Sequence, residues 1–396
     1  MKKKLTVALV SHIIKDDNLG CGALAISNIK LIDEVFKRKN VEVSYVVAIT
    51  DNLTQIDMSK YTANNFEYRV YPRCRQTLRN PFLLLRTKVF DGCDLVINLC
   101  GGDGYADIYG FGRLLAESQL ALLGKLRKTP VVYAPQTIGP FATRKGRLVA
   151  KVTLGKVNHI FVRDHASYNC CENLGLQKKT TEVIDVAFAL PFNKQIRSNN
   201  HKQIGINVSG LLYYGGYDRK NYFGLSFSYK EFIEKLLFRL CSIEGVNIHL
   251  IPHVNSDTNE IEDDYVVCKK LAQKYNCILA PRYDSPIDVK NYISGMDLFS
   301  GARMHSTIGA ISSGVPVIPV AYSRKFNGLY GSLEYPWLID AKAEIDVDQA
   351  IDLFFEYMSK IDQMQESVVH AEKIYLSRLE QYQKYISEIL GKLHNI

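Results

Sequence analysis

Short runs of β-branched and aliphatic residues alternate along this chain with longer stretches that carry helical periodicity, and this alternation constrains the fold most. In the first half, the runs begin at Leu5, Val41, Leu95, Val131 and His159. Each run has the length of a strand and is followed by a segment long enough for a helix. Such repetition is typical of parallel sheets, in which helices connect successive strands. We therefore expect an α/β protein.

A second series of the same kind follows a polar segment without apolar periodicity at residues 193–202. Its strands are expected near Ile204, Asn247, Cys277, Asp297 and Val315. From Asp346 onward, apolar residues recur at three- and four-residue spacing, which indicates helices. A length of 396 residues fits two domains of ordinary size. We expect two Rossmann-like domains facing a cleft, residues 1–192 and 203–340, braced by C-terminal helices at 345–396.

The charge is unevenly distributed. Lys and Arg exceed Asp and Glu by only 8, which does not indicate a nucleic-acid partner. However, no carboxylate occurs between Glu67 and Asp91 or between Glu117 and Asp164, and both segments are rich in Lys and Arg. A basic surface suited to phosphates or anionic lipid headgroups is one interpretation. Ordinary solvated helix faces are the other.

The nine cysteines form no CxxC pair, which favours reduced, mostly buried thiols and a cytoplasmic protein. No apolar stretch is long enough to span a bilayer, so we expect any membrane contact to be peripheral. The apolar run at the N-terminus ends at Ser11 without a small-residue cleavage site. We interpret it as a strand rather than a signal peptide.

Open parallel sheets bind ligands beyond the carboxyl ends of their strands, so the loops there hold the candidate site residues. Gly101–Gly104 follows one strand, and its glycines allow close approach of a phosphate or sugar. Asp16–Gly22 precedes a helix expected from Ala23, where backbone amides can meet an anion. A tight turn and a simple helix cap remain the alternatives for these two segments.

The strongest local signal is Gly301–Ser306, between a short strand and a helix. Arg303 and His305 combine a bidentate anion ligand with a group that titrates near neutral pH, both at the positive end of a helix. A capped helix with an incidental histidine is the alternative. If the next strand lies beside this one, Ser323–Lys325 adds positive charge at the same edge. Arg163, at the end of a strand in the first domain, either reaches the cleft or pairs with a carboxylate inside its own domain.

An aromatic-rich stretch from Leu211 to Tyr229 contains Tyr213 and Tyr214 among glycines and is too irregular for a regular element. Sugar binding and plain loop packing both fit it, and His253 fits either a core or a cleft position. No metal-ligand spacing and no nucleophile elbow occurs in the sequence. We expect catalysis without a metal, an organic cofactor or a covalent intermediate.

Together, these motifs resemble those of the polysaccharide pyruvyl transferase family. The resemblance spans residues 5–330 and rests on four elements: Gly101-Gly102-Asp103, Ala134–Pro140 (APQTIGP), Val162-Arg163-Asp164 with Ser167, and GARMHSTIGAISSGVPVIPVAYSRKFNGL from Gly301. It implies a two-domain fold like that of GT-B glycosyltransferases. It further implies transfer from phosphoenolpyruvate onto two hydroxyls of a lipid-linked or polymeric saccharide, for capsule, exopolysaccharide or cell-wall decoration at the cytoplasmic membrane face. The products would be a pyruvate ketal and phosphate.

The resemblance also implies roles for individual residues. The expected catalytic residues are His305, as general acid, with Arg303 and Arg163. Donor binding is expected from Arg163, Arg303, Met304, His305, Ser306 and Lys325. Acceptor binding is expected from Asp17, Asn18, Gly102, Asp103, Gln136, Tyr213, Tyr214 and His253. Cys21 stands where many members carry Asp, so the resemblance assigns no general base here.

Two other functions fit the same pattern. A GT-B glycosyltransferase that uses a nucleotide sugar would share the architecture, but no carboxylate follows His305 before Glu334 to bind a ribose. That gap favours a small anionic donor. A non-catalytic sugar-binding or scaffold protein of a polysaccharide assembly is the alternative from another class.

Overall fold

The computed structural model describes residues 4–50, 55–196 and 200–394, which form two compact units. Unit 1 contains the residues up to Ile14, Leu24–Ala189 and the stretch from Ser377 onward. Unit 2 contains Lys15–Ala23 and Leu190–Leu376. Compared with the expected domains, the structure groups a short N-terminal segment with unit 2 and divides the C-terminal helical segment between the units. Part of the expected boundary, residues 197–199, lies outside the described residues.

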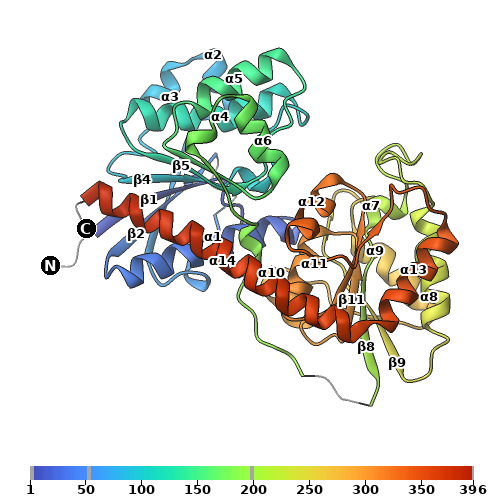
Figure 1. Ribbon diagram of the computed structural model, residues 1–396. Coiled ribbons are helices and arrows are strands. Elements are labelled where there is room, and N and C mark those ends of the chain that lie inside the picture. The colour runs from blue at the N-terminus through green and yellow to red at the C-terminus, as the bar shows by residue number, and fades with distance from the viewer. Residues whose placement is uncertain (1–3, 51–54, 197–199, 395–396) are drawn as a thin grey trace. The chain divides into compact units, whose positions relative to one another are not determined.

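Unit 1 is built on a seven-stranded sheet in which all neighbouring strands are parallel (Figure 1). The strand order is β3-β2-β1-β4-β5-β6-β7. The strands are β1 (Lys4–Val10), β2 (Glu42–Ile49), β3 (Asn65–Val70), β4 (Leu95–Asn98), β5 (Val131–Gln136), β6 (His159–Val162) and β7 (Thr180–Glu182).

Helices cover both faces of this sheet, as a doubly wound fold requires. On one face are α1 (Leu19–Arg38) and the end of α14 (Ile361–His394), where the Tyr382 hydroxyl donates to Asn28 Oδ1 at 2.7 Å. The helices on the other face are α2 (Cys74–Arg79), α3 (Phe82–Arg86), α4 (Phe111–Leu126), α5 (Arg144–Leu154) and α6 (His165–Asn173). Single 3₁₀ turns are η2 (Met58–Lys60), η3 (Cys100–Gly102), η4 (Gln177–Lys179) and η5 (Val186–Ala189).

Unit 2 is a second parallel α/β layer structure with a six-stranded sheet in the order β10-β9-β8-β11-β12-β13. Its strands are β8 (Lys202–Asn207), β9 (Val246–Leu250), β10 (Ile278–Leu279), β11 (Leu298–Gly301), β12 (Val317–Ala321) and β13 (Ile339–Asp340). Its helices are α7 (Gly210–Tyr213), α8 (Tyr229–Leu240), α9 (Asp264–Tyr275), α10 (Pro286–Ile293), α11 (Met304–Ile311), α12 (Arg324–Ser332), α13 (Val347–Ser359) and the first part of α14.

The expectation of two parallel α/β domains is therefore confirmed, and every strand expected from an apolar run is present. In the unit 1 sheet, strands β4, β5 and β6 are buried along their whole length, because helices cover both faces. All nine cysteines are free thiols, but only Cys100, Cys171 and Cys268 are buried. The expectation of mostly buried thiols is wrong, because several of them lie in surface helices and loops.

Candidate active site

The candidate site of unit 2 lies at the carboxyl edge of its sheet, where β8 and β11 end side by side. Gly301 of β11 pairs with Asn207 of β8, so the residue that follows β11 by two positions, Arg303, emerges next to the end of β8. The backbone amide of Arg303 donates to Asn207 Oδ1 at 3.0 Å. This bond fixes the start of α11 and therefore the direction in which the Arg303 side chain leaves the backbone.

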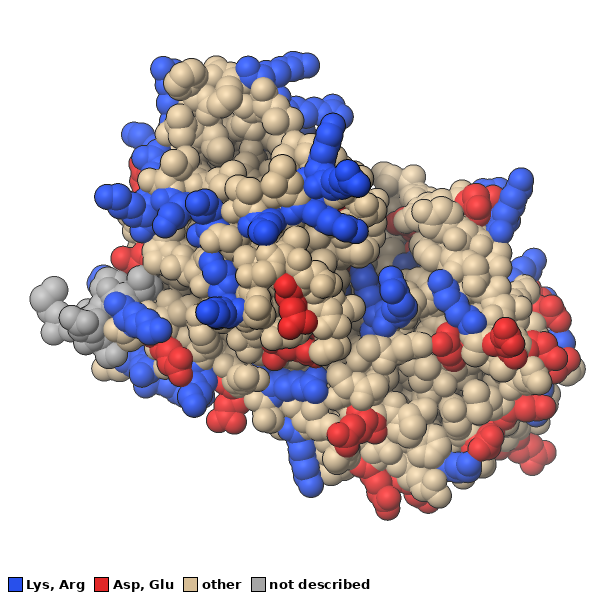
Figure 2. Space-filling model, turned by 45° about the horizontal axis from the view of Figure 1, so that its top comes forward, with Lys and Arg blue, Asp and Glu red and all other residues tan. Residues whose placement is uncertain are grey.

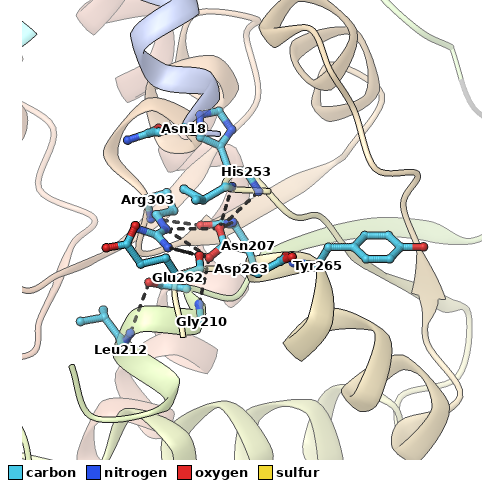
Figure 3. A network of polar contacts seen from close by, with 12 residues as sticks. Asn18, Asn207, Gly210, Leu212, His253, Glu262, Asp263, Tyr265 and Arg303 are labelled. Carbon is cyan, nitrogen blue, oxygen red and sulfur yellow. Dashed lines mark hydrogen bonds and ion pairs between the residues drawn. The ribbon is translucent and has the colours of Figure 1, made fainter. Parts of the chain in front are cut away.

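A buried carboxylate, Asp264 at the start of α9, holds the Arg303 guanidinium. Figure 3 shows Arg303 in one network of polar contacts with Asn207 and Glu262. Arg303 Nη2 donates to Asp264 Oδ1 at 2.8 Å, and Arg303 Nε lies 3.2 Å from both carboxylate oxygens. Nη2 also donates to the Glu262 carbonyl at 3.0 Å. Since these bonds use Nε and Nη2, the guanidinium is fixed on one side, and Nη1 makes no hydrogen bond to a described residue.

The same carboxylate organises the surrounding loops. Asp264 Oδ1 accepts the backbone amide of Gly210 at 2.9 Å, and Oδ2 accepts the amides of Val254 at 3.1 Å and His253 at 3.3 Å. Asp264 is completely shielded from solvent, and burying a carboxylate is costly unless it is paired and hydrogen-bonded. Burial opposes the charge of Arg303, but Asp264 outweighs this and raises the pKa of Arg303, which therefore stays cationic.

Two histidines lie beside this network. His253 follows β9 and is 3% exposed, and neither of its ring nitrogens has a hydrogen-bond partner among the described residues. Burial, together with the charges of His305 and Arg303, lowers the pKa of His253 to about 3. His253 is therefore a neutral imidazole at physiological pH. His305 lies in the first turn of α11 and is half-buried.

The start of α1 closes one side of this histidine pair. Leu19 donates its amide to the His253 carbonyl at 3.3 Å, and Asn18 forms a β-bridge with Val254. At Gly20 the backbone approaches the His305 ring so closely that an added Cβ would lie 2.2 Å from His305 Nδ1. A residue with a side chain at Gly20 would therefore collide with the imidazole.

The other unit 2 residues expected in the site have the following positions. Asp17 accepts the Ser256 hydroxyl at 2.8 Å, and Asn18 Oδ1 accepts the Gly20 amide at 3.0 Å. Met304 is half-buried in the first turn of α11, whereas the Ser306 hydroxyl is buried and donates to the Arg303 carbonyl at 2.7 Å. Lys325 lies in the first turn of α12, directly after β12. Because β12 pairs with β11, Lys325 follows the same sheet edge as Arg303, as expected if the two strands are neighbours.

Tyr213 and Tyr214 are half-buried at the end of α7 rather than in an irregular loop. Their rings pack against the unit 2 core, and their hydroxyls contact Glu234 at 2.7 Å and Lys270 at 3.2 Å. The expectation that this stretch contains no regular element is wrong at its first residues, because Ser209 caps a short helix there. Tyr217 is an exposed aromatic side chain at the edge of the network, where its hydroxyl donates to the Glu262 carboxylate.

The remaining predicted residues form a second polar cluster, in unit 1, at the carboxyl ends of β4, β5 and β6. Arg163 is buried, and it donates to Thr137 Oγ1 at 3.0 Å and to Asp185 Oδ2 at 2.7 Å. Gln136 is also buried; its Nε2 donates to the Asn98 carbonyl at 3.1 Å, while its Oε1 has no partner among the described residues.

Gly102 and Asp103 complete this unit 1 cluster. Gly102 has a φ of 92°, and its carbonyl accepts the Thr137 amide at 2.8 Å. Asp103 accepts the Tyr109 hydroxyl at 3.0 Å. The intradomain ion pair considered for Arg163 is present, with Asp185 as its partner. The shared cleft and the individual roles of these residues stay predictions.

Sequence reasoning missed Asp264 and Asn207. The signals available were the Glu262-Asp263-Asp264 run before an apolar helix and a polar residue at the end of a buried strand. In the described part of the chain, no group of three or more His, Cys, Asp or Glu residues is arranged to hold a metal ion. Likewise, none of the described helices is long and apolar enough to cross a membrane.

Solved structures with the same architecture include the UDP-GlcNAc 2-epimerase of Neisseria meningitidis bound to UDP-GlcNAc. It is 14% identical with a TM-score of 0.58, over 98% of this chain and 100% of that one. Anabaena Alr3699/HepE in complex with UDP-glucose is 11% identical with a TM-score of 0.59, over 98% of this chain and 100% of that one. These similarities define the class of protein: a two-domain α/β protein with the GT-B fold, as expected.

Residues 18–324 match the polysaccharide pyruvyl transferase family, and the chain belongs to that family. The amylovoran biosynthesis protein AmsJ of Erwinia amylovora is 24% identical over 264 residues, or 61% of this chain. The match covers about 60% of the length of AmsJ. The expected family is thus confirmed, and its matched region includes Arg163, Arg303 and His305.

Proposed function

We propose that the protein transfers the enolpyruvyl group of phosphoenolpyruvate to two hydroxyls of one sugar in a saccharide, which forms a pyruvate ketal and releases phosphate. The single observation that carries this proposal is the arrangement at the start of α11. Arg303 is held by Asp264 and Asn207, and His305 follows it by two residues beside a buried neutral His253. Family membership supports the reaction class.

Arg303 is suited to bind the donor's carboxylate or phosphate. Its ion pair with Asp264 already fixes the guanidinium. Binding of an anion to Arg303 therefore costs little further side-chain entropy. Lys325 of α12 and the N-terminus of α11 add further positive charge. Phosphoenolpyruvate carries two anionic groups, and this set of cations would neutralise them without a metal ion.

His305 is the proposed general acid. A group that protonates carbon must carry a transferable proton at the working pH. The buried His253, with its pKa of about 3, is not a cation at that pH and does not supply this proton. Neutral His253 is instead suited to hydrogen-bond a substrate hydroxyl, since neither of its ring nitrogens has a partner among the described residues. In this proposal His305 acts on the donor and His253 orients the acceptor.

The proposed reaction proceeds through two additions. His305 gives its proton to the methylene carbon of phosphoenolpyruvate, and the adjacent carbon becomes an oxocarbenium-like centre. The first sugar hydroxyl attacks this centre and loses its proton. The C–O bond to phosphate then breaks, phosphate departs with the bonding pair, and the second hydroxyl attacks and loses its proton to close the ketal ring. Arg303 and Lys325 stabilise the phosphate as it leaves.

A saccharide acceptor is proposed because the family and the name of AmsJ both concern polysaccharide synthesis. We further propose that the acceptor is lipid-linked and that the reaction takes place at the cytoplasmic face of the membrane. Asp17, Asn18 and His253 are the proposed acceptor ligands of unit 2, because Asn18 and His253 lie near His305 and Asp17 directly precedes Asn18.

The test is to incubate the full chain with phosphoenolpyruvate and a panel of lipid-linked or synthetic galactose, mannose and glucose acceptors. The expected result is acceptor-dependent phosphate release and a product that has gained the mass of a pyruvyl ketal. His305→Gln should lower kcat by about 10²- to 10⁴-fold, whereas the control His201→Gln, at an exposed position, should retain the rate. Sugar transfer from a nucleotide sugar, without phosphoenolpyruvate binding, would instead identify a glycosyltransferase. A fully active His305→Gln protein would exclude His305 as the acid.

A further inference from the structure

A surface of unit 1 displays apolar side chains that nothing in the described structure covers. In α2 and α3, four large apolar residues within eight positions are exposed: Leu78 (61%), Phe82 (66%), Leu83 (39%) and Leu85 (47%). Leu84 alone among the leucines of α3 turns inward and packs against the unit 1 core. Since burial of apolar area drives folding, a helix that leaves most of its apolar side chains outside indicates a surface that is covered in another setting.

Helices α2 and α3, which carry these exposed side chains, are anchored to the rest of unit 1 by hydrogen bonds. The Thr77 hydroxyl, buried beneath α2, donates to Gln119 Oε1 of α4 at 2.7 Å. Arg127 Nη2 donates to the carbonyls of Leu85 at 2.9 Å and Thr87 at 3.0 Å. These hydrogen bonds hold the inner sides of α2 and α3 against the rest of unit 1. The apolar side chains on the opposite sides therefore point outward.

The surface continues onto α4 and α5. Helix α4 contacts α2, α3 and α5, so the four helices form one contiguous layer. Leu126 of α4 and Leu148 of α5 are 62% and 64% exposed. We call this layer, with its exposed apolar and cationic side chains, the α2–α5 surface.

The α2–α5 surface is also strongly cationic. No carboxylate lies between Glu67 and Asp91 or between Glu117 and Asp164, the two segments that contain most of this layer. Figure 2 shows Lys and Arg side chains spread over this part of unit 1, between uncharged side chains and with few Asp or Glu among them. Exposed cations on these helices and the turns beside them include Arg75, Arg79, Arg86, Lys88, Arg144 and Lys145.

We propose that the α2–α5 surface docks on an anionic lipid bilayer, with Phe82 and its neighbouring leucines inserted between the headgroups and the Arg and Lys side chains bound to lipid phosphates. Surfaces that bind anionic membranes combine aliphatic side chains with flanking cations. The aliphatic side chains insert toward the acyl chains, and the cations bind the anionic headgroups. A second copy of the chain would bring like charges together across a twofold interface. Single-stranded nucleic acid would call for stacked aromatic side chains rather than leucines.

The proposal goes beyond the transfer reaction and can fail separately from it, because its test contains neither phosphoenolpyruvate nor a sugar. The full chain is sedimented with vesicles of phosphatidylcholine alone and of phosphatidylcholine mixed with phosphatidylglycerol. Binding is expected only to the mixed vesicles and should weaken as salt is raised. Equal binding to both vesicle types, or to neither, would overturn the proposal.

Two pairs of variants locate the contact. Phe82→Ser combined with Leu83→Ser should weaken binding at least ten-fold, whereas Phe238→Ser should retain it. Phe238 is a matched control because it is 67% exposed, on α8 of unit 2. These substitutions replace exposed side chains, so folding should be unaffected, and a thermal melt checks this.

Charge reversal provides the second pair. Arg75→Glu with Arg79→Glu should also weaken binding at least ten-fold, because each cation near an anionic surface strengthens partitioning about five-fold. Lys220→Glu with Lys269→Glu, at exposed positions of unit 2, is the matched control. If the Phe82 and Leu83 variant binds vesicles normally but abolishes a concentration-dependent dimer in gel filtration, the surface is an interface between copies and the proposal is wrong.

Discussion

Asp264→Asn is the substitution that tests the site's architecture most severely. Asp264 Oδ1 receives hydrogen bonds from Arg303 Nη2 and the Gly210 amide, and Oδ2 receives those of Val254 and His253. Whichever oxygen becomes the amide nitrogen, its N–H groups face other donors. The variant thus loses the carboxylate charge opposite a buried guanidinium and places donors against donors at one of the two positions.

The expected cost follows from the burial of this ion pair, with Asp264 fully buried and the Arg303 side chain 13% exposed. Removing one partner of a buried pair costs about 3–5 kcal/mol, because the remaining charge stays uncompensated. Asp263→Asn is the matched control at the adjacent position. Asp263 is also buried, but it caps α9 by accepting the Tyr265 amide at 2.8 Å, and Asn caps helices about as well as Asp. Its ion-pair partner Arg282 lies 3.7 Å away, is partly exposed and is held at 2.6 Å by Asp257, so a change within about 1 kcal/mol is expected.

The assay is urea unfolding followed by fluorescence of Trp337, the only tryptophan of the chain, which lies in unit 2. For Asp264→Asn the midpoint should fall with little change in slope, and the affinity for phosphoenolpyruvate should fall with it because Arg303 is no longer held. If Asp264→Asn unfolds at the same urea concentration as Asp263→Asn and binds the donor as well, Asp264 does not position Arg303.

Two further substitutions probe the histidine pair. Gly20→Ala should lower kcat about 10- to 100-fold, because its Cβ would lie 2.2 Å from His305 Nδ1, while Gly112→Ala, in open space on α4, should not; equal rates for the two variants would contradict the close approach. The pKa of His253 is lowered in the folded protein, so its contribution to stability is present above about pH 6.5 and is lost as the pH falls toward 3, roughly 4 to 5 kcal/mol in all. His253→Gln should therefore flatten the loss of stability on acidification by about 1.4 kcal/mol per pH unit between about pH 6 and 4, and His201→Gln should leave it unchanged, as thermal melts across this range would measure. An unaltered slope for His253→Gln would show that His253 is not buried in neutral form.

The sequence predicted the strands that are specified by a local run of apolar residues. Runs such as LTVALV and VVYAP became β1 and β5 because their side chains are apolar on both faces, as buried parallel strands require. The strands that were not expected are β3, β7 and β13, all at sheet edges. Edge strands are exposed on one side and need no continuous apolar run, so β3 (NFEYRV) reads as polar and β7 and β13 are very short.

Long-range contacts explain what the sequence left out of the site. Arg303 and His305 were found because their spacing and their position at a helix start are local features of the sequence. Asp264 lies 39 residues before Arg303, and Asn207 lies 96 residues before Arg303. Those separations close only when β8, β9 and β11 are ordered side by side in the sheet. Tyr213 and Tyr214 were placed in a loop because the glycines that follow them mask a single helical turn.

The measurement that tests the central claim most directly is transfer from phosphoenolpyruvate to a saccharide acceptor in D₂O, with mass analysis of the product. Protonation of the methylene carbon by His305, whose proton exchanges with solvent, predicts a ketal whose methyl group carries one deuterium. Phosphate should be released in equal amount. A ketal without deuterium would contradict solvent-derived protonation by a general acid, and absence of any pyruvylated product would contradict the proposed function itself.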